Sequence, residues 1–198
     1  MVEGYGRRLP HELCRRRNPF AQWSHCPQFE WPNYGVVFVS DQIHPNVTRV
    51  VEAAKALGLD IQPKRFPDGT KTALDAAAAI GVQVGQIVKS LIFAVDGEVV
   101  LAYVSGANQL DEKKLALAAG GLKCARVDAD VVRDATGFPI GGVPPFGHKT
   151  HLRVFIDPDL LQYDEVWAAA GTWNDVFGIE PHKLVKASGG VVTDLKRG

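Results

Sequence analysis

The sequence predicts an α+β domain built around a mostly antiparallel or mixed sheet. Segments typical of helices and of strands follow one another irregularly, without the regular strand–helix alternation of a parallel sheet. Two apolar runs are split by Asp96-Gly97, which is a strong signal for a β-hairpin. The chain has 198 residues, of which 46% are hydrophobic, and this suits one well-buried domain.

The elements before the hairpin are predicted from periodicity and glycine stops. Residues 44–60 carry valine, alanine and leucine at helical spacing and reach a glycine at Gly58, which predicts an amphipathic helix. Residues 61–66 predict a short strand, and the alanine-rich segment 71–81 predicts a helix that also ends at a glycine.

The hairpin and the elements after it follow the same logic. Residues 110–121 have acidic residues at their start and Gly120 near their end, as a helix favours. The remaining predicted elements are hairpin strands at 86–95 and 98–106, a short helix at 128–135, strands at 152–157 and 164–171, and a last helix at 180–188.

Residues 1–40 differ from everything after them. Three consecutive arginines, Arg15 to Arg17, stand among four prolines, and no periodicity lasts. We expect residues 1–40 to form an irregular extension, either disordered or the result of a misassigned start, and residues 41–198 to form the domain. The set His11, Cys14, His25 and Cys26 includes an adjacent His-Cys pair, which is not a usual zinc spacing, so no metal is predicted.

Composition excludes several classes of function. The formal net charge is zero and no basic recognition helix is seen, so DNA binding is disfavoured and any contact with nucleic acid is local. The apolar runs are far too short to span a bilayer and no signal peptide is seen, which predicts a cytoplasmic protein without membrane contact. Three cysteines are too few for a disulfide framework, and we expect reduced thiols.

The segment 135–149, ATGFPIGGVPPFGHK, combines four glycines with three prolines and predicts a shaped loop. Gly142 and Gly147 have the spacing of a phosphate-binding loop, but His148 stands where that loop needs lysine. The prolines also remove N–H groups that would hold a phosphate. A nucleotide-phosphate site is therefore rejected, and a rigid surface turn remains as the alternative to a functional loop.

Lys89 lies within the first hairpin strand, where alternation places it on the same face as Leu91 and Phe93. Lysine is rarely buried without a partner. Its side chain either reaches water from the start of the strand or forms a cationic anchor at the mouth of a pocket. The sequence lacks the motifs of serine hydrolases, zinc proteases and redox dithiols. Ser105 is more typical of a turn, and His148 and His151 of exposed or structural histidines.

Three segments, VKSLIFAV around Lys89, NQLDEKKLALAAGG at 108–121 and the loop at 135–149, resemble the YbaK/EbsC family of aminoacyl-tRNA deacylases. The same domain occurs as the editing insertion of bacterial prolyl-tRNA synthetases. The resemblance covers residues 44–195 and implies a central, strongly bent mixed sheet. It also implies hydrolysis of the ester of a mischarged tRNA, usually a tRNA for proline carrying a small wrong amino acid, with no cofactor.

The resemblance also implies the site residues. Lys89 matches the family lysine that contacts the 3′ end of the aminoacyl-tRNA, and Gly141 and Gly142 belong to the loop that encloses the ester. We expect these three residues to be catalytic, with loop N–H groups stabilising an oxyanion and a side chain at Gly142 filling the space of the ester. The family's lack of a protein base implies that a ribose hydroxyl helps to activate water. The expected substrate-binding residues are Ser90, Val143, Pro144, Pro145, His148 and Gly171.

The sequence departs from the family at the pocket wall. Many members carry Ser-Gly-Gly where this chain has Ala169-Ala170-Gly171, and residues 173–177 read as an insertion. The amino acid and the tRNA are therefore left open, as is a synthetase partner in addition to the tRNA acceptor end. A non-catalytic module that binds aminoacyl-tRNA is the alternative function.

Overall fold

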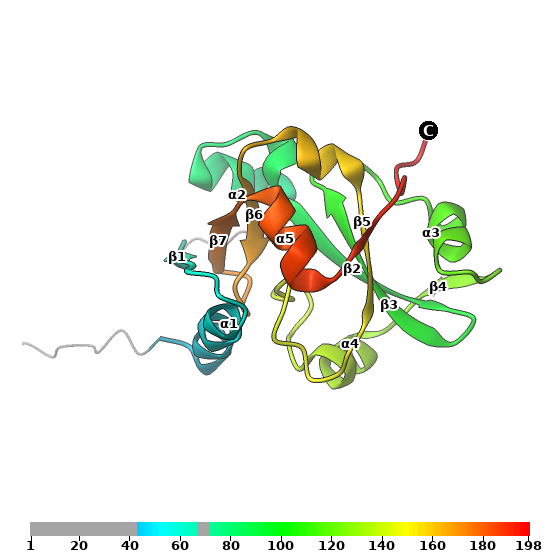
Figure 1. Cartoon of the computed structure of the whole chain (residues 1–198), viewed down its shortest axis with the longest axis horizontal. Coiled ribbons are helices and arrows are strands. Elements are labelled where there is room, and N and C mark those ends of the chain that lie inside the picture. Colours follow the sequence, from blue (N-terminus) through cyan, green and yellow to red (C-terminus); the bar gives the residue numbers. More distant parts are fainter. Residues whose placement is uncertain (1–42, 67–71) are drawn as a thin grey trace, which may run out of the picture. The chain divides into compact units, whose positions relative to one another are not determined.

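The computed structural model describes residues 43–66 and 72–198 (Figure 1). The predicted extension at 1–40, with its histidines and cysteines, lies outside these residues, and its prediction stays a prediction. The described elements are α1 Pro45–Ala56, β1 Lys64–Arg65, α2 Ala73–Ile80, η2 Val84–Gln86, β2 Val88–Val95, β3 Glu98–Ser105, α3 Glu112–Ala118, β4 Cys124–Arg126, α4 Ala129–Thr136, β5 Arg153–Ile156, η3 Pro158–Gln162, β6 Val166–Ala169, β7 Asp175–Ile179, α5 Pro181–Ser188 and β8 Val191–Val192.

The strands form two sheets, and the α+β prediction is confirmed. A five-stranded sheet has the order β4-β2-β3-β5-β8, in which β3, β5 and β8 are parallel and the other pairs antiparallel. A three-stranded antiparallel sheet has the order β1-β7-β6. An isolated β-bridge between Ile87 and Trp167 connects the two. The predicted central mixed sheet is thus the five-stranded one.

All five predicted helices are present, and no helix of the described segments is long and apolar enough to cross a membrane. The hairpin also forms as predicted, because Asp96 and Gly97 have φ of 50° and 92°, as its two-residue turn requires. The predicted strand at 61–66 shrinks to the two residues of β1. Strands β4, β7 and β8 were not predicted, and β7 includes most of the segment interpreted as an insertion.

Strand β2 is paired unequally on its two edges. Along one edge it pairs with β3 from Val88 to Val95, over its whole length. Along the other edge it pairs with β4 only from Phe93 to Val95, and Ile87 forms the bridge to Trp167. In the described part of the chain, residues 88–92 therefore leave one strand edge without a strand partner, and we call this the open edge of β2.

The two faces of β2 pack into different clusters of buried side chains. Phe93 and Val95 contact the cluster that contains Leu115 of α3, which lies beside β4 in Figure 1. Val88 belongs to the larger cluster, to which α1, α4 and α5 also contribute. The predicted alternation of faces is therefore confirmed for these residues.

The glycine- and proline-rich loop is fixed to the larger cluster rather than lying free on the surface. Phe138, Val143 and Phe146 are all buried in that cluster. The hydroxyl of Tyr103, a fully buried residue of β3, donates to the carbonyl oxygen of Pro145 at 2.9 Å. The loop therefore has its own anchors in the core of the domain.

We predict that Tyr103→Phe lowers the free energy of unfolding by about 1–2 kcal/mol, because the buried Pro145 carbonyl loses its donor. Urea denaturation measures this change. The matched control is Tyr163→Phe, since the Tyr163 hydroxyl has no hydrogen bond to any described residue. Equal stability of the Tyr103 variant and the wild type would show that this bond does not anchor the loop.

Candidate functional site

Lys89 lies on the open edge of β2 and is half-buried. Its Nζ donates a hydrogen bond to the backbone carbonyl oxygen of Asn108. Burial lowers the pKa of Lys89, and the nearby carboxylate of Asp157 acts in the opposite direction. The ammonium group is thus held inside the fold by a carbonyl oxygen instead of extending into bulk water.

Two cavities meet at this lysine. The first cavity, of about 330 Å³, extends from β2 toward α2, β6 and β7, and the second, of about 600 Å³, extends toward β4 and the C-terminal residues. Both are lined by Lys89, Ser90, Leu91, Ile140, Gly141 and Val143. One stretch of the open edge and one stretch of the loop therefore border both cavities.

The two cavities differ in their charge. The described residues that line only the first cavity are uncharged, and they include Ala76, Trp167 and Ala169. The second cavity is lined by Arg126 and Arg197 together with Glu112, which lies 3.8 Å from Arg126. The first cavity suits an uncharged, largely apolar group, whereas the second suits an anionic or polar one.

The loop offers fewer free donors than the sequence suggests. The N–H of Gly142 already donates to the carbonyl oxygen of Pro139 at 3.0 Å, within a turn of the loop itself. The N–H groups of Gly141 and Val143 have no acceptor among the described residues. Gly141 has a φ of 80°, so it takes a conformation that favours glycine at the border of both cavities.

Gly142 and Gly171 allow close packing and line neither cavity in the described part of the chain. A Cβ on Gly142 would lie 2.9 Å from the Cα of Thr172, so it would meet the 171–172 backbone and not the space of an ester. A Cβ on Gly171 would meet Asn46 of α1 at 2.9 Å. The expectation that a side chain at Gly142 fills the ester space is corrected accordingly.

Pro144, Pro145 and His148 also lie away from both cavities, as far as the described residues show. Nε2–H of His148 donates to the carbonyl oxygen of Pro144 at 2.7 Å, and its ring packs edge-on against Phe138. Burial lowers the pKa of His148, which favours the neutral ring. In this geometry these three residues hold the shape of the loop.

Several residues of the site were not predicted from the sequence. Arg126 reaches the second cavity from β4, and Arg197 from beyond the last strand. The Nε1 of Trp167 is buried and has no partner among the described residues, and the same is true of the Oγ of Ser90, a residue that was expected to bind substrate. Alternation within β2 singled out Lys89, but only the folding of distant segments brings Arg126, Trp167 and Arg197 to the site.

Comparisons with known proteins point to aminoacyl-tRNA editing domains. A family model described as an aminoacyl-tRNA editing domain matches residues 67–187. A solved structure described as a candidate trans-editing enzyme for prolyl-tRNA synthetase is 43% identical, with a TM-score of 0.75 over 79% of this chain and 99% of that one.

Two curated relatives show how far the similarity extends. The uncharacterized protein YwhH of Bacillus subtilis is 33% identical over 62% of this chain and 78% of its own length. The proline–tRNA ligase of Maridesulfovibrio salexigens is 35% identical over 54% of this chain, but the match spans only 18% of the ligase. Because the family model covers more than half of the sequence, the chain belongs to the YbaK family of aminoacyl-tRNA editing domains.

Proposed function

We propose that this protein hydrolyses the ester of a mischarged tRNA, specifically a tRNA for proline that carries a small wrong amino acid. The observation that carries the proposal is the meeting of two unlike cavities at Lys89 and Gly141. An aminoacyl ester also has two unlike halves, an amino acid and a ribonucleotide, joined at the bond to be cleaved.

The amino acid is assigned to the first cavity and the terminal nucleotide to the second. The apolar wall of the first cavity accepts an uncharged side chain and penalises a charged one. The guanidinium groups of Arg126 and Arg197 in the second cavity attract the phosphates of the acceptor end. This division leaves the ester carbonyl beside Lys89 and the loop.

Hydrolysis then needs no protein nucleophile. The oxygen of a water molecule attacks the ester carbonyl carbon, helped by the neighbouring ribose hydroxyl, and the carbonyl oxygen becomes an oxyanion. The free N–H groups of Gly141 and Val143 are the candidate donors to that oxyanion, and Lys89 holds the acceptor end. The bond to the ribose oxygen breaks, that oxygen takes up a proton, and a free amino acid and an uncharged tRNA leave.

The relatives support proline as the cognate amino acid. The ligase relatives are proline–tRNA ligases, and the solved structure is described as an editing enzyme for the same synthetase. Neither description names the amino acid that is removed. The test is single-turnover hydrolysis of tRNA for proline charged with alanine, serine or cysteine, beside proline itself. Tight binding of all four without faster ester loss would identify a binding module instead.

We predict that Lys89→Ala lowers the single-turnover rate by a factor of about 10², because the ester loses the anchor that positions its carbonyl at the loop donors. The fold should survive, because the side chain makes one hydrogen bond and lines cavities. Lys113→Ala, on the exposed surface of α3, is the control and should leave the rate unchanged. A normal rate in the Lys89 variant would remove this residue from the mechanism.

We predict that Gly141→Ala lowers the rate at least about tenfold, because a side chain resists the positive φ and shifts the peptide groups that carry the free N–H donors. Gly189→Ala is the matched control, since Gly189 has a φ of 61° and lies outside both cavities. Both variants should lose similar stability in thermal melts. Equal rates for the two would assign the oxyanion to donors outside the loop.

We predict that Arg126→Gln raises KM for the charged tRNA several-fold with little change in kcat, since a phosphate contact contributes to binding and not to the chemical step. The dependence of KM on salt should weaken in the same variant. Arg133→Gln on α4 removes an exposed charge that lines neither cavity and serves as the control. An unchanged KM and salt slope would contradict the assignment of the nucleotide to the second cavity.

A further inference from the structure

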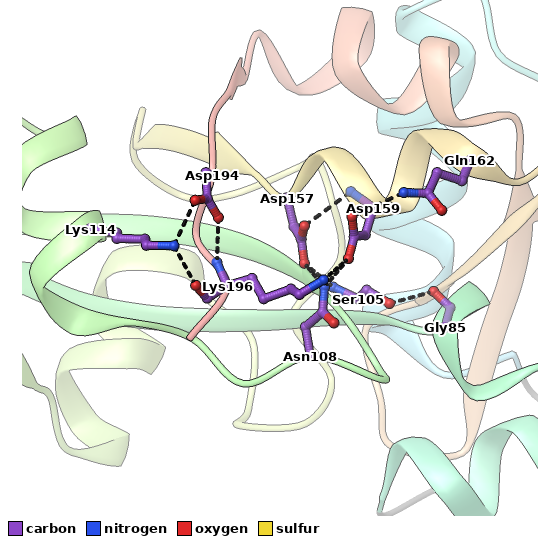
Figure 2. A network of polar contacts seen from close by, with 9 residues as sticks. All are labelled: Gly85, Ser105, Asn108, Lys114, Asp157, Asp159, Gln162, Asp194 and Lys196. Carbon is purple, nitrogen blue, oxygen red and sulfur yellow. Dashed lines mark hydrogen bonds and ion pairs between the residues drawn. The ribbon is translucent and has the colours of Figure 1, made fainter. Parts of the chain in front are cut away.

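Asn108 connects Lys89 to a buried acidic group. Its backbone carbonyl oxygen accepts the hydrogen bond from Nζ of Lys89. Its side-chain Nδ2 donates to carboxylate oxygens of Asp157 and Asp159, each at 2.8 Å. Figure 2 shows both carboxylates pointing toward Asn108. Asn108, which accepts the hydrogen bond of Lys89, is therefore itself fixed by two carboxylates.

Asp157 is a fully buried carboxylate at the end of β5. One of its oxygens accepts from the N–H of Asp159, and the other accepts from the N–H of Ser105 and from Asn108. It forms no ion pair with a described residue, and its charge favours the charged forms of Lys89 and Lys196. Burying a carboxylate is costly, so a role for its charge is expected.

Other charged groups lie around this arrangement. Glu112, Arg126 and Arg197 line the second cavity together with Lys89. Behind Asn108, Lys196 pairs with Asp159 at 3.0 Å, and the exposed end of the network is the pair of Lys114 and Asp194 at 2.6 Å (Figure 2). Of the two carboxylates bonded to Asn108, Asp159 has a lysine partner of its own, whereas Asp157 has none in the described part. Asp157 is thus the buried countercharge to Lys89.

We propose that Asn108 and Asp157 are positioning residues for Lys89: Asp157 fixes the Asn108 side chain, and the Asn108 carbonyl fixes the ammonium group at the junction of the two cavities. The Asp157 charge also helps the lysine to stay protonated despite its burial. The effect on rate rests on the proposed function, whereas the effect on the lysine itself does not.

The first test measures Lys89 without any substrate. The pKa of its amine is followed by NMR of the isotope-labelled methylated protein, with the signal assigned through Lys89→Arg. Asp157→Asn should lower this pKa by at least about half a unit, because an opposite charge is removed. Asp194→Asn, at the exposed end of the same network, should leave it unchanged. An unaltered pKa in a folded Asp157 variant would overturn the role of the charge.

Asn108→Ala tests separately whether the side-chain bonds of Asn108 position Lys89. It keeps the proposal testable if the Asp157 variant does not fold. The carbonyl oxygen remains, but the two side-chain bonds that hold it are lost. Lys89 should then react several-fold faster with an amine reagent, relative to Lys113, as measured by mass spectrometry. A reaction rate equal to that of the wild type would overturn the positioning role.

The activity readout follows from the same logic. If charged Lys89 is required, the alkaline limb of the pH dependence of kcat/KM should move to lower pH in Asp157→Asn, and kcat/KM should fall about tenfold on that limb. A profile that stays in place while kcat/KM falls would contradict the proposal. If the wild type hydrolyses no charged tRNA, the proposed function fails, while the two substrate-free measurements still decide this inference.

Discussion

The site depends on the unequal pairing of β2. One edge of this strand is fully paired with β3, but β4 covers the other edge only from Phe93 to Val95. An unpaired edge presents free N–H and C=O groups, and proteins usually pair or cover such edges. Here the loop around Gly141 borders the edge without pairing to it, and the space between them forms the two cavities. The site therefore lies where the strand pairing of the sheet is interrupted.

A lysine at such an edge creates an electrostatic problem, because its ammonium is half-buried beside apolar walls. Burial alone would favour the neutral amine, which would be a poor anchor for an anionic acceptor end. Two groups favour the charged form of Lys89: the backbone carbonyl of Asn108 accepts its hydrogen bond, and the buried carboxylate of Asp157 attracts its charge. The turn after β3 and the end of β5 therefore serve the site as well as the fold.

Local signals predicted most of the fold and part of the site. Helical periodicity, glycine stops and the Asp96-Gly97 turn gave the helices and the hairpin, and alternation singled out Lys89. Strands β4 and β7 were missed because strands of three and five residues with polar members are defined by distant partners. For the same reason Arg126 was not foreseen, and nothing in the sequence separates His148, which anchors the loop, from a residue that binds substrate.

The two adjacent glycines of the loop show why geometry is needed to separate roles. Gly141 is required by its positive φ, whereas Gly142 is required because backbone from the 171–172 turn lies where its side chain would be. Donors that stabilise an oxyanion must be held in place before the charge develops. Tyr103 and the buried loop side chains provide that rigidity, and the Gly142 N–H is used within the loop turn. The loop that borders the open edge is therefore anchored in the core of the domain. The N–H groups of Gly141 and Val143 remain its candidate hydrogen-bond donors to the oxyanion.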